Sequence, residues 1–555
     1  MTDIEIANSA ELSPITEIAE KIGIEPNQLE LFGKYKAKLP LSLIDEESIK
    51  RSKLILVTAI SPTPAGEGKT TVSIGLSQGM NKVGMNTTVV LREPSLGPVF
   101  GIKGGAAGGG YSQVLPMEDI NLHFTGDFSA IEKANNLLAA LIDNNIQSKS
   151  RSLHIDPRTV AWKRVMDMND RSLRKIVVGL GGLGQGIPRE AGFDITAASE
   201  IMAILCLSRD IEDLKERIGN IFVGFTFDKK PIYARNLNAQ GAMTILLKDA
   251  IKPNLVQTIE GTPAIIHGGP FANIAQGTNT VVATKMGLST APYVVTEAGF
   301  GADLGAEKFL DIKCVDANLK PDAVVIVATI KALKYHGGKS LDTLKESDPE
   351  AVQKGLPNLE KHIENIESFG LPVLVTVNRY TTDSEGEISA VKSFCESKNV
   401  RFEVCDVWGD GGSGATALAE ELRELIEKEP SRFKPLYERT DSPKTKIEKL
   451  CKNYYGADDV EYSAQAQKDL KRISDLGLDN LPICMAKTQS SISDNPKLLG
   501  RPEGFDFHIR EIEIAAGAGF IIPIAGSMMR MPGLPATPAA EGMDIDKDGK
   551  ITGLS

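Results

Sequence analysis

The chain has 555 residues, of which 42% are hydrophobic and 24% are charged, so it is long enough for large buried cores and too apolar for a disordered protein. Its 73 acidic residues outnumber its 62 basic ones, and the resulting net charge of −11, without a basic cluster, argues against nucleic acid as the main partner. We expect a cytoplasmic protein with no membrane partner, because there is no signal-peptide pattern and no apolar run of membrane-spanning length, and the six scattered cysteines favour reduced thiols.

The first chemical signal in the chain is a turn between a predicted strand and a predicted helix. Residues 1–50 alternate charged and apolar positions, which predicts amphipathic helices, and they carry no such signal. The apolar, β-branched run 53–60 predicts a strand buried on both faces, and apolar residues recur at helical spacing from Val72 to Met80. The turn between them, residues 61–71, therefore has the setting that a phosphate-binding P-loop requires.

This turn matches the P-loop pattern G-x-x-x-x-G-K-[ST] except at its first position, where Thr63 replaces glycine. Glycines let successive backbone N–H groups converge on phosphate oxygens, and a helix N-terminus adds partial positive charge. The pattern predicts that Lys69 contacts the β- and γ-phosphates and that the Thr70 hydroxyl ligates the Mg²⁺ bound with ATP. An ordinary Gly/Pro turn is the alternative. The predicted ATP-binding residues are Thr63, Pro64, Ala65, Gly66, Glu67, Gly68, Lys69 and Thr70.

A second predicted strand, Thr87–Leu91, runs directly into Arg92 and Glu93. Ligands of parallel α/β sheets bind outside the carboxyl ends of the strands, so this segment is expected beside the P-loop. We therefore predict that Arg92 and Glu93 lie near the γ-phosphate and act in catalysis together with Lys69. A surface turn with a solvated ion pair is the alternative.

The next segment, residues 101–111, is rich in glycine and carries one lysine, Lys103. Such a composition is typical of a flexible linker. A linker here would interrupt the nucleotide domain, however, and a glycine-rich loop also allows close backbone approach to an anionic ligand. Both interpretations stay open.

From there predicted strands and helices alternate, which predicts an α/β fold with a mainly parallel, P-loop NTPase-like sheet and helices on both faces. Among the expected strands are residues 175–179, 221–226, 292–296, 322–328, 371–377 and 400–405. We expect a large P-loop domain at residues 1–365, an α/β domain at 366–477 and a small C-terminal α/β domain at 478–555.

Later strand ends carry histidines and aromatic residues. Lone histidines are more often structural than catalytic, so the roles of His267 and His336 stay open. Tyr380 and Trp408 each follow a predicted strand. A tryptophan at a glycine-rich strand end can stack on a flat ligand, although core packing would explain it equally well.

Three motifs together resemble the formate–tetrahydrofolate ligase family, in its monofunctional form. They are the P-loop variant at residues 63–70, the glycine-rich run 101–111 and the segment 327–338, and the resemblance extends over essentially the whole chain. It implies ATP-dependent ligation of formate to tetrahydrofolate, which gives 10-formyltetrahydrofolate, ADP and phosphate through formyl phosphate.

The resemblance also implies roles for individual residues and for partners. Lys69 and Arg92 match positions that hold phosphate and formyl phosphate, with Glu93 beside them, while Phe300, Tyr380 and Trp408 match the folate pocket, where aromatic rings hold the pterin. The implied ligands are ATP with Mg²⁺, formate and tetrahydrofolate, and the family also implies a homotetramer and a possible monovalent cation.

Two positions depart from the family pattern. Lys331 stands where arginine is usual, which would remove a bidentate contact, and Tyr380 stands where some members have phenylalanine, which preserves stacking. Two alternative functions remain: a P-loop ATPase switch that acts on a protein partner, and another ATP-dependent ligase for a small carboxylate. The first would require neither the glycine-rich run nor the aromatic strand ends.

Overall fold

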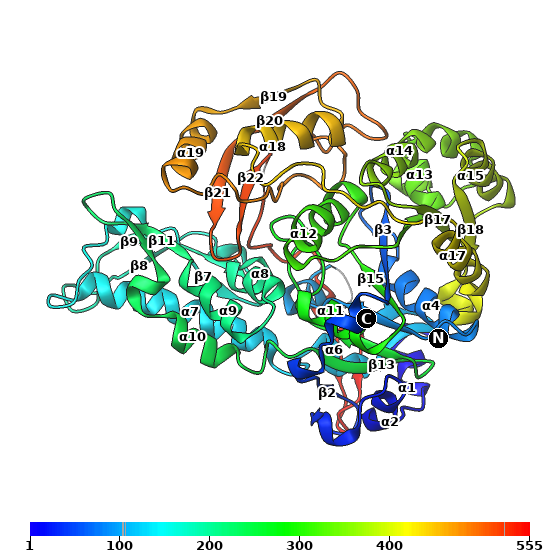
Figure 1. Cartoon of the computed structure of the whole chain (residues 1–555), viewed down its shortest axis with the longest axis horizontal. Coiled ribbons are helices and arrows are strands. Elements are labelled where there is room, and N and C mark those ends of the chain that lie inside the picture. Colours follow the sequence, from blue (N-terminus) through cyan, green and yellow to red (C-terminus); the bar gives the residue numbers. More distant parts are fainter. Residues whose placement is uncertain (103–104, 106, 527, 555) are drawn as a thin grey trace.

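The computed structural model describes residues 1–102, 105, 107–526 and 528–554, and it is built around one large sheet (Figure 1). The strands follow the order β1-β2-β13-β14-β4-β15-β3-β16-β17-β18, and β6, paired with β5, joins beside β13. Their bounds are β1 Glu30–Leu31, β2 Ala37–Lys38, β3 Lys53–Ala59, β4 Thr87–Leu91, β5 Gly108–Gly109, β6 Ser112–Leu115, β13 Asn254–Thr258, β14 Pro263–Ile266, β15 Tyr293–Glu297, β16 Ala323–Ala328, β17 Val373–Asn378 and β18 Arg401–Cys405.

The sheet is parallel over most of its width. All neighbouring pairs from β14 to β18 are parallel. Antiparallel pairing is confined to the side that holds β1, β2, β13, β5 and β6. The predicted α/β class with a mainly parallel central sheet is confirmed.

Helices bury both faces of the parallel strands. Along β3, Leu54 and Leu56 belong to one core cluster, whereas Ile55 and Val57 belong to the other, because alternate side chains of a strand point to opposite faces. The first face packs against α11 (Val281–Thr290), α13 (Ile330–His336) and α14 (Pro349–Ser368), and the second against α4 (Lys69–Lys82) and α17 (Thr416–Lys428).

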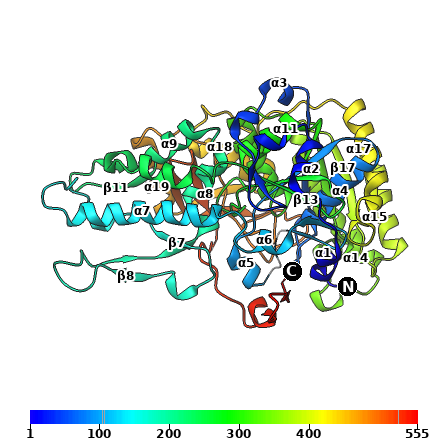
Figure 2. The same ribbon diagram turned by 90° about the horizontal axis from the view of Figure 1, so that it is seen from below.

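Two further units flank the sheet. A helical lobe, residues 127–250, extends to the left in Figure 1, and the long helix α7 runs along it in Figure 2. A C-terminal unit, residues 443–530, lies at the top of Figure 1. The lobe contains α7 (Asp127–Gln147), β7 (Arg164–Met166), β8 (Ile176–Val178), β9 (Arg189–Ala191), β10 (Phe193–Ile195), α8 (Glu200–Leu207), α9 (Ile211–Gly219), β11 (Phe222–Phe225), β12 (Pro231–Tyr233) and α10 (Gln240–Leu247). The C-terminal unit contains α18 (Pro443–Lys449), β19 (Asp459–Tyr462), α19 (Ala464–Asp475), β20 (Asp506–Ile509), β21 (Glu511–Ala515) and β22 (Phe520–Ile524).

The pairing of some strands differs from the sequence-based expectation. The runs 175–179 and 221–226 were expected in the alternating α/β sheet, but β8 pairs only with β9 and β11 only with β12, as separate hairpins. β17 and β18, from the segment 366–477, extend the same sheet as β3. A division at residue 365 thus does not follow the sheet, and the three expected domains remain a prediction.

Candidate functional site

The predicted site residues converge on one edge of the central sheet. Strands β3, β4, β14, β15, β16, β17 and β18 are mutually parallel, so their carboxyl ends lie along the same edge. The segments that follow β3, β4, β15, β17 and β18 carry the predicted catalytic, ATP-binding and folate-binding residues. This edge is where open α/β sheets bind ligands.

The turn after β3 contains two glycines in the left-handed conformation. Gly66 has φ +85° and Gly68 has φ +69°, a conformation that favours glycine. Gly68 is the N-cap of α4, and a Cβ there would lie 2.5 Å from the Asn378 side-chain nitrogen. Both glycines are thus required by the backbone, and the positive end of the α4 dipole faces the site.

Glu67 explains why the loop tolerates Thr63 at the position of the missing glycine. The buried Glu67 carboxylate accepts hydrogen bonds from the Thr63 backbone N–H at 2.6 Å and from its hydroxyl at 3.0 Å, and the Thr329 hydroxyl donates to its second oxygen. Burial raises the pKa of Glu67. Glu67 therefore holds the loop together from inside, and Thr63 supplies two of the donors.

Lys69 and Thr70 open helix α4, and both are half-buried. The Thr70 hydroxyl donates a 2.8 Å hydrogen bond to Glu297 Oε2. Glu297 is the last residue of β15, and its side chain is only 2% exposed. The sequence predicted a strand that ends here, but it predicted no role for Glu297. Glu297 is therefore the main residue of the candidate site to which the sequence analysis assigned no function.

Arg92 lies on the other side of the same carboxylate. Its Nη2 is 3.6 Å from Glu297 Oε1, and its Nη1 donates to the Pro270 carbonyl at 3.4 Å. A Cβ on Gly299 would come within 2.9 Å of Arg92 Nη1. The absence of a side chain at Gly299 therefore leaves room for the guanidinium group to lie against the backbone. The buried Nε of Arg92 has no hydrogen-bond partner among the described residues.

Glu93 is directed into the interior. Its side chain is 6% exposed, and burial raises the pKa of its carboxyl group well above the usual range, with the negative charge of Asp127 adding to the effect. The other groups that act on its charge are Lys38 and Asp167, and neither belongs to the P-loop. A catalytic role of Glu93 remains a prediction that this placement does not strengthen.

The three aromatic candidates occupy different positions along the edge. Phe300 has φ +61°, which is a strained conformation for a bulky residue and is typical of functional sites. The Tyr380 hydroxyl lies 3.6 Å from where a Cβ of Gly68 would be, and Lys331 Nζ lies 3.9 Å from the centroid of its ring. Tyr380 is therefore close to the P-loop, and a cation already contacts its ring.

Trp408 packs against the glycine-rich run. It lies on the short helix α16 (Val407–Asp410) and its side chain is 50% exposed, while its carbonyl accepts a 2.9 Å hydrogen bond from the Tyr111 N–H. A Cβ on Gly109 would come within 3.4 Å of the indole ring. Glycine thus permits the contact between ring and loop, although Lys103, Gly104 and Ala106 of this run are outside the described residues.

The two histidines left open by the sequence are structural. His267 is fully buried and contacts the Thr280 hydroxyl at 2.7 Å and the Ala250 carbonyl at 2.6 Å. His336 bridges the Ser61 carbonyl and the Gly500 N–H, each at 3.0 Å. Burial lowers the pKa of both imidazoles to about 4, so they are neutral near pH 7.

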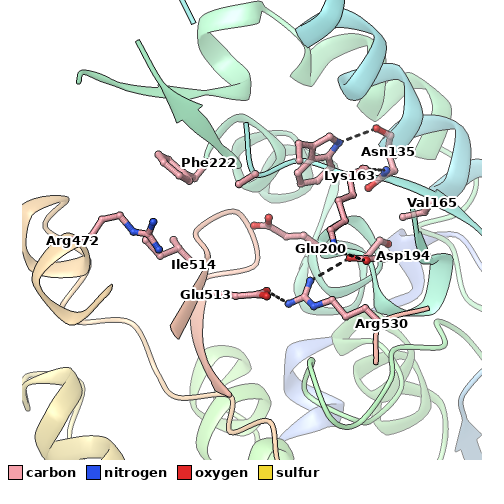
Figure 3. A pocket seen from close by; sticks show the side chains of 13 residues that line it. Asn135, Lys163, Val165, Asp194, Glu200, Phe222, Arg472, Glu513, Ile514 and Arg530 are labelled. Carbon is pink, nitrogen blue, oxygen red and sulfur yellow. Dashed lines mark hydrogen bonds and ion pairs between the residues drawn. The ribbon is translucent and has the colours of Figure 1, made fainter. Parts of the chain in front are cut away.

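A pocket of about 240 Å³ lies between the helical lobe and the C-terminal unit, and none of the predicted site residues lines it (Figure 3). Four of its charged side chains pair with one another. Arg530 forms an ion pair with Glu513 and lies 3.5 Å from Asp194, which also contacts Lys163 at 3.1 Å. These charges are therefore largely compensated within the protein.

No group of three or more metal-ligating side chains and no helix suited to span a membrane occurs among the described residues. The six cysteines are buried and unpaired. The sequence was also compared with models of known protein families. The model described as formate–tetrahydrofolate ligase matches residues 1–555, the whole length of the chain.

Proposed function

The chain belongs to the formate–tetrahydrofolate ligase family, whose members join formate to tetrahydrofolate with the use of ATP, and on this premise we propose that the reaction takes place at the carboxyl edge of the central sheet. The observation that carries the proposal is the contact of Glu297 with both Thr70 and Arg92. It joins the turn after β3 to the end of β4, where the sequence predicts nucleotide and formate chemistry. The family match over all 555 residues does not favour a protein-switch ATPase.

ATP is proposed to bind with its phosphates over the turn 63–70, in the manner of a P-loop NTPase. The left-handed glycines and the N-terminus of α4 direct backbone N–H groups and partial positive charge to this place, and Lys69 adds a full charge. In the proposed arrangement these groups stabilise charge that develops on the transferred phosphoryl group.

The residues present also suit a Mg²⁺ ion. The Thr70 hydroxyl offers an oxygen donor, which this hard cation prefers, and Glu297 accepts the proton of that hydroxyl from behind. Mg²⁺ bound there with ATP would neutralise phosphate charge during transfer. The monovalent cation that the family resemblance suggests is part of the proposal without an assigned residue.

We propose formyl phosphate as the intermediate. An oxygen of formate attacks the γ-phosphorus, ADP leaves, and the former formate oxygen becomes the bridge between carbon and phosphorus. The N10 nitrogen of tetrahydrofolate then attacks the formyl carbon, phosphate leaves with the bridging oxygen, and N10 loses its proton. Arg92 suits the first step, because its planar fork can contact the phosphoryl group and the attacking carboxylate together.

Isotope labelling tests this intermediate directly. With ¹⁸O-labelled formate, one labelled oxygen is expected in the inorganic phosphate released during turnover, as measured by mass spectrometry. Unlabelled phosphate would exclude formyl phosphate. Initial rates of ATP turnover with formate alone, tetrahydrofolate alone and both together would separate the ligase from the alternative carboxylate ligase and from the switch ATPase.

Tetrahydrofolate is proposed to lie beside the phosphates with its pterin against the aromatic residues. Trp408 supports this best, because half of its side chain is exposed while one contact fixes it to the glycine-rich run. The strained backbone of Phe300 places a second ring at the end of β15. Tyr380 lies close enough to Gly68 to link the folate and phosphate regions.

The homotetramer implied by the family resemblance is also a proposal, and the helical lobe supports it. The β8–β9 hairpin exposes Val177 (58%), Leu180 (66%) and Leu183 (96%), and α10 exposes Ile245 (70%). We propose that the hairpin residues form part of an interaction surface, because exposed apolar side chains that lie together are typical of one. Light scattering of the wild type and of Leu183→Asp would test it, and an unchanged molar mass in the variant would exclude the hairpin from the interface.

A further inference from the structure

The position of Glu297 follows from the order of the strands. β15 lies between β3 and β4, with Glu297 in register with Val57 of β3 and Thr296 in register with Val90 of β4. β3 is followed by the proposed P-loop, and β4 is followed by Arg92. A side chain at the end of β15 is therefore the shortest bridge between the two segments, and it is anchored on a rigid strand.

Each carboxylate oxygen of Glu297 contacts one of these segments. Oε2 accepts the Thr70 hydroxyl at 2.8 Å, and Oε1 lies 3.6 Å from Arg92 Nη2. The side chain is 2% exposed, and a carboxylate so deeply buried requires partners for its charge. The two partners are the groups proposed to act on the metal-bound nucleotide and on the phosphoryl group in transfer.

The hydrogen bond to Thr70 has a directional consequence. A hydroxyl has one proton and two lone pairs, and the proton of Thr70 is directed to Glu297. The lone pairs are thereby left for a cation on the side of the nucleotide. Groups of this kind behind a metal ligand commonly affect metal affinity by about 10- to 100-fold.

We propose that Glu297 is a positioning residue that orients the Thr70 hydroxyl toward Mg²⁺ and holds the Arg92 guanidinium beside it, so that the metal-bound nucleotide and the phosphoryl-transfer group are coupled. The proposal rests on the proposed function, because it requires ATP at the P-loop. A purely structural carboxylate would stabilise the fold without linking Mg²⁺ to ATP binding.

Calorimetric titration of ATP at several Mg²⁺ concentrations tests the first half of the proposal. In Glu297→Gln, which keeps the size of the side chain, the Mg²⁺-dependent gain in ATP affinity should shrink by about tenfold or more, with ATP binding in EDTA little changed. Glu297→Asp keeps the charge but is one methylene shorter, and it should give an intermediate loss. This second variant also serves if the glutamine variant does not fold.

The matched control is Asp322→Asn. Asp322 is paired with Lys53 at 2.9 Å and lies just before β16, at the opposite, amino edge of the same sheet. The Asp322→Asn substitution removes one carboxylate from the sheet at a distance from the candidate site. The Mg²⁺-dependent gain in ATP affinity of this variant should therefore equal that of the wild type. A Mg²⁺ dependence unchanged in both Glu297 variants would overturn the proposal.

A double-mutant cycle tests the coupling to Arg92. If Glu297 holds Arg92 in place, the losses in kcat of Glu297→Gln and Arg92→Lys should combine to clearly less than their product, whereas fully multiplicative losses would contradict the coupling. The Lys69→Ala variant separates this result from the proposed function. Retained turnover in Lys69→Ala would refute the P-loop itself, while an inactive Lys69→Ala with normal Mg²⁺ dependence in Glu297→Gln would refute only the role of Glu297.

Discussion

The carboxyl edge of the central sheet and the pocket of Figure 3 are both polar, but they differ in how their charges are compensated. In the pocket, Arg530 contacts Glu513 and Asp194, and Lys163 also contacts Asp194, so cations and carboxylates satisfy one another. At the sheet edge, Arg92 lies 3.6 Å from Glu297, and its Nε, like the Nε of Arg472 at the pocket, has no partner among the described residues. The helix N-terminus of α4 adds further positive potential there.

This difference in charge is why we propose the sheet edge, and not the pocket, as the site for an anionic substrate. At the edge, the N-terminus of α4 and Lys69 add positive charge, which suits the proposed binding of triphosphate and formate. The pocket is a gap between two units that is bridged by ion pairs. Four predictions test this contrast, in the order of their expected effect on ligase activity.

The largest effect is expected for Lys69→Ala. The change removes a positive charge from the place where negative charge concentrates during phosphoryl transfer. The resulting decrease in kcat/KM should correspond to a loss of about 3 kcal/mol or more of transition-state stabilisation. Steady-state kinetics measures this, with circular dichroism to verify folding. A folded variant with nearly normal turnover would remove the basis for placing ATP at the edge.

Arg92→Lys should give the next largest effect. Lysine keeps the positive charge but lacks the planar fork of the guanidinium group. The decrease in kcat should therefore correspond to an increase in activation free energy on the order of 2 kcal/mol, while the affinity for ATP changes little. Kinetics combined with calorimetric ATP binding separates the two quantities. An equal loss in both would mean that Arg92 binds the ground state and not specifically the transition state.

Trp408→Ala should affect the folate substrate alone. Loss of stacking predicts an increase in KM for tetrahydrofolate that corresponds to roughly 1–3 kcal/mol, with the KM for ATP nearly unchanged. Because the indole is half exposed, the fold should tolerate the change. Parallel increases in both constants would indicate a disturbed glycine-rich run and would weaken the folate assignment.

The smallest effect on activity is expected in the pocket, for Glu200→Gln. Glu200 accepts hydrogen bonds from the N–H groups of Gly517 and Ala518 at 2.8 and 3.2 Å, and burial raises its pKa from 4.5 to about 7. A carboxyl group with a pKa raised by folding stabilises the protein fully below about pH 4.5, and this contribution is lost as the pH rises through 7.

Glutamine cannot ionise, so the variant should lose less stability than the wild type between about pH 4.5 and 7, a difference on the order of 1 kcal/mol per pH unit. Urea unfolding at several pH values measures it. Ligase activity at pH 7 should stay close to that of the wild type. A strong loss of activity in a folded Glu200→Gln variant would show that the pocket takes part in the reaction after all.

Some parts of the candidate site could be predicted from the sequence and others could not. The strand 53–60 and the turn after it were predicted because a buried run, two glycines and a helix start are local signals. Arg92 was found by the same rule at the next strand. Glu297 also lies at a predicted strand end, but it received no role because nothing in its own segment indicates that it contacts Thr70 and Arg92.

Local pattern and chemical type are therefore what the sequence by itself determined: the α/β class and the family, together with the predictions of a phosphate-binding turn and of aromatic strand ends. Only the tertiary structure decided which strands are neighbours. β15 lies between β3 and β4 although it is separated from them in the chain by some 200 residues, and this order brings Glu297 between Thr70 and Arg92. Strand order is set by packing of the whole sheet and its helices, a sum of many long-range contacts that no short segment encodes.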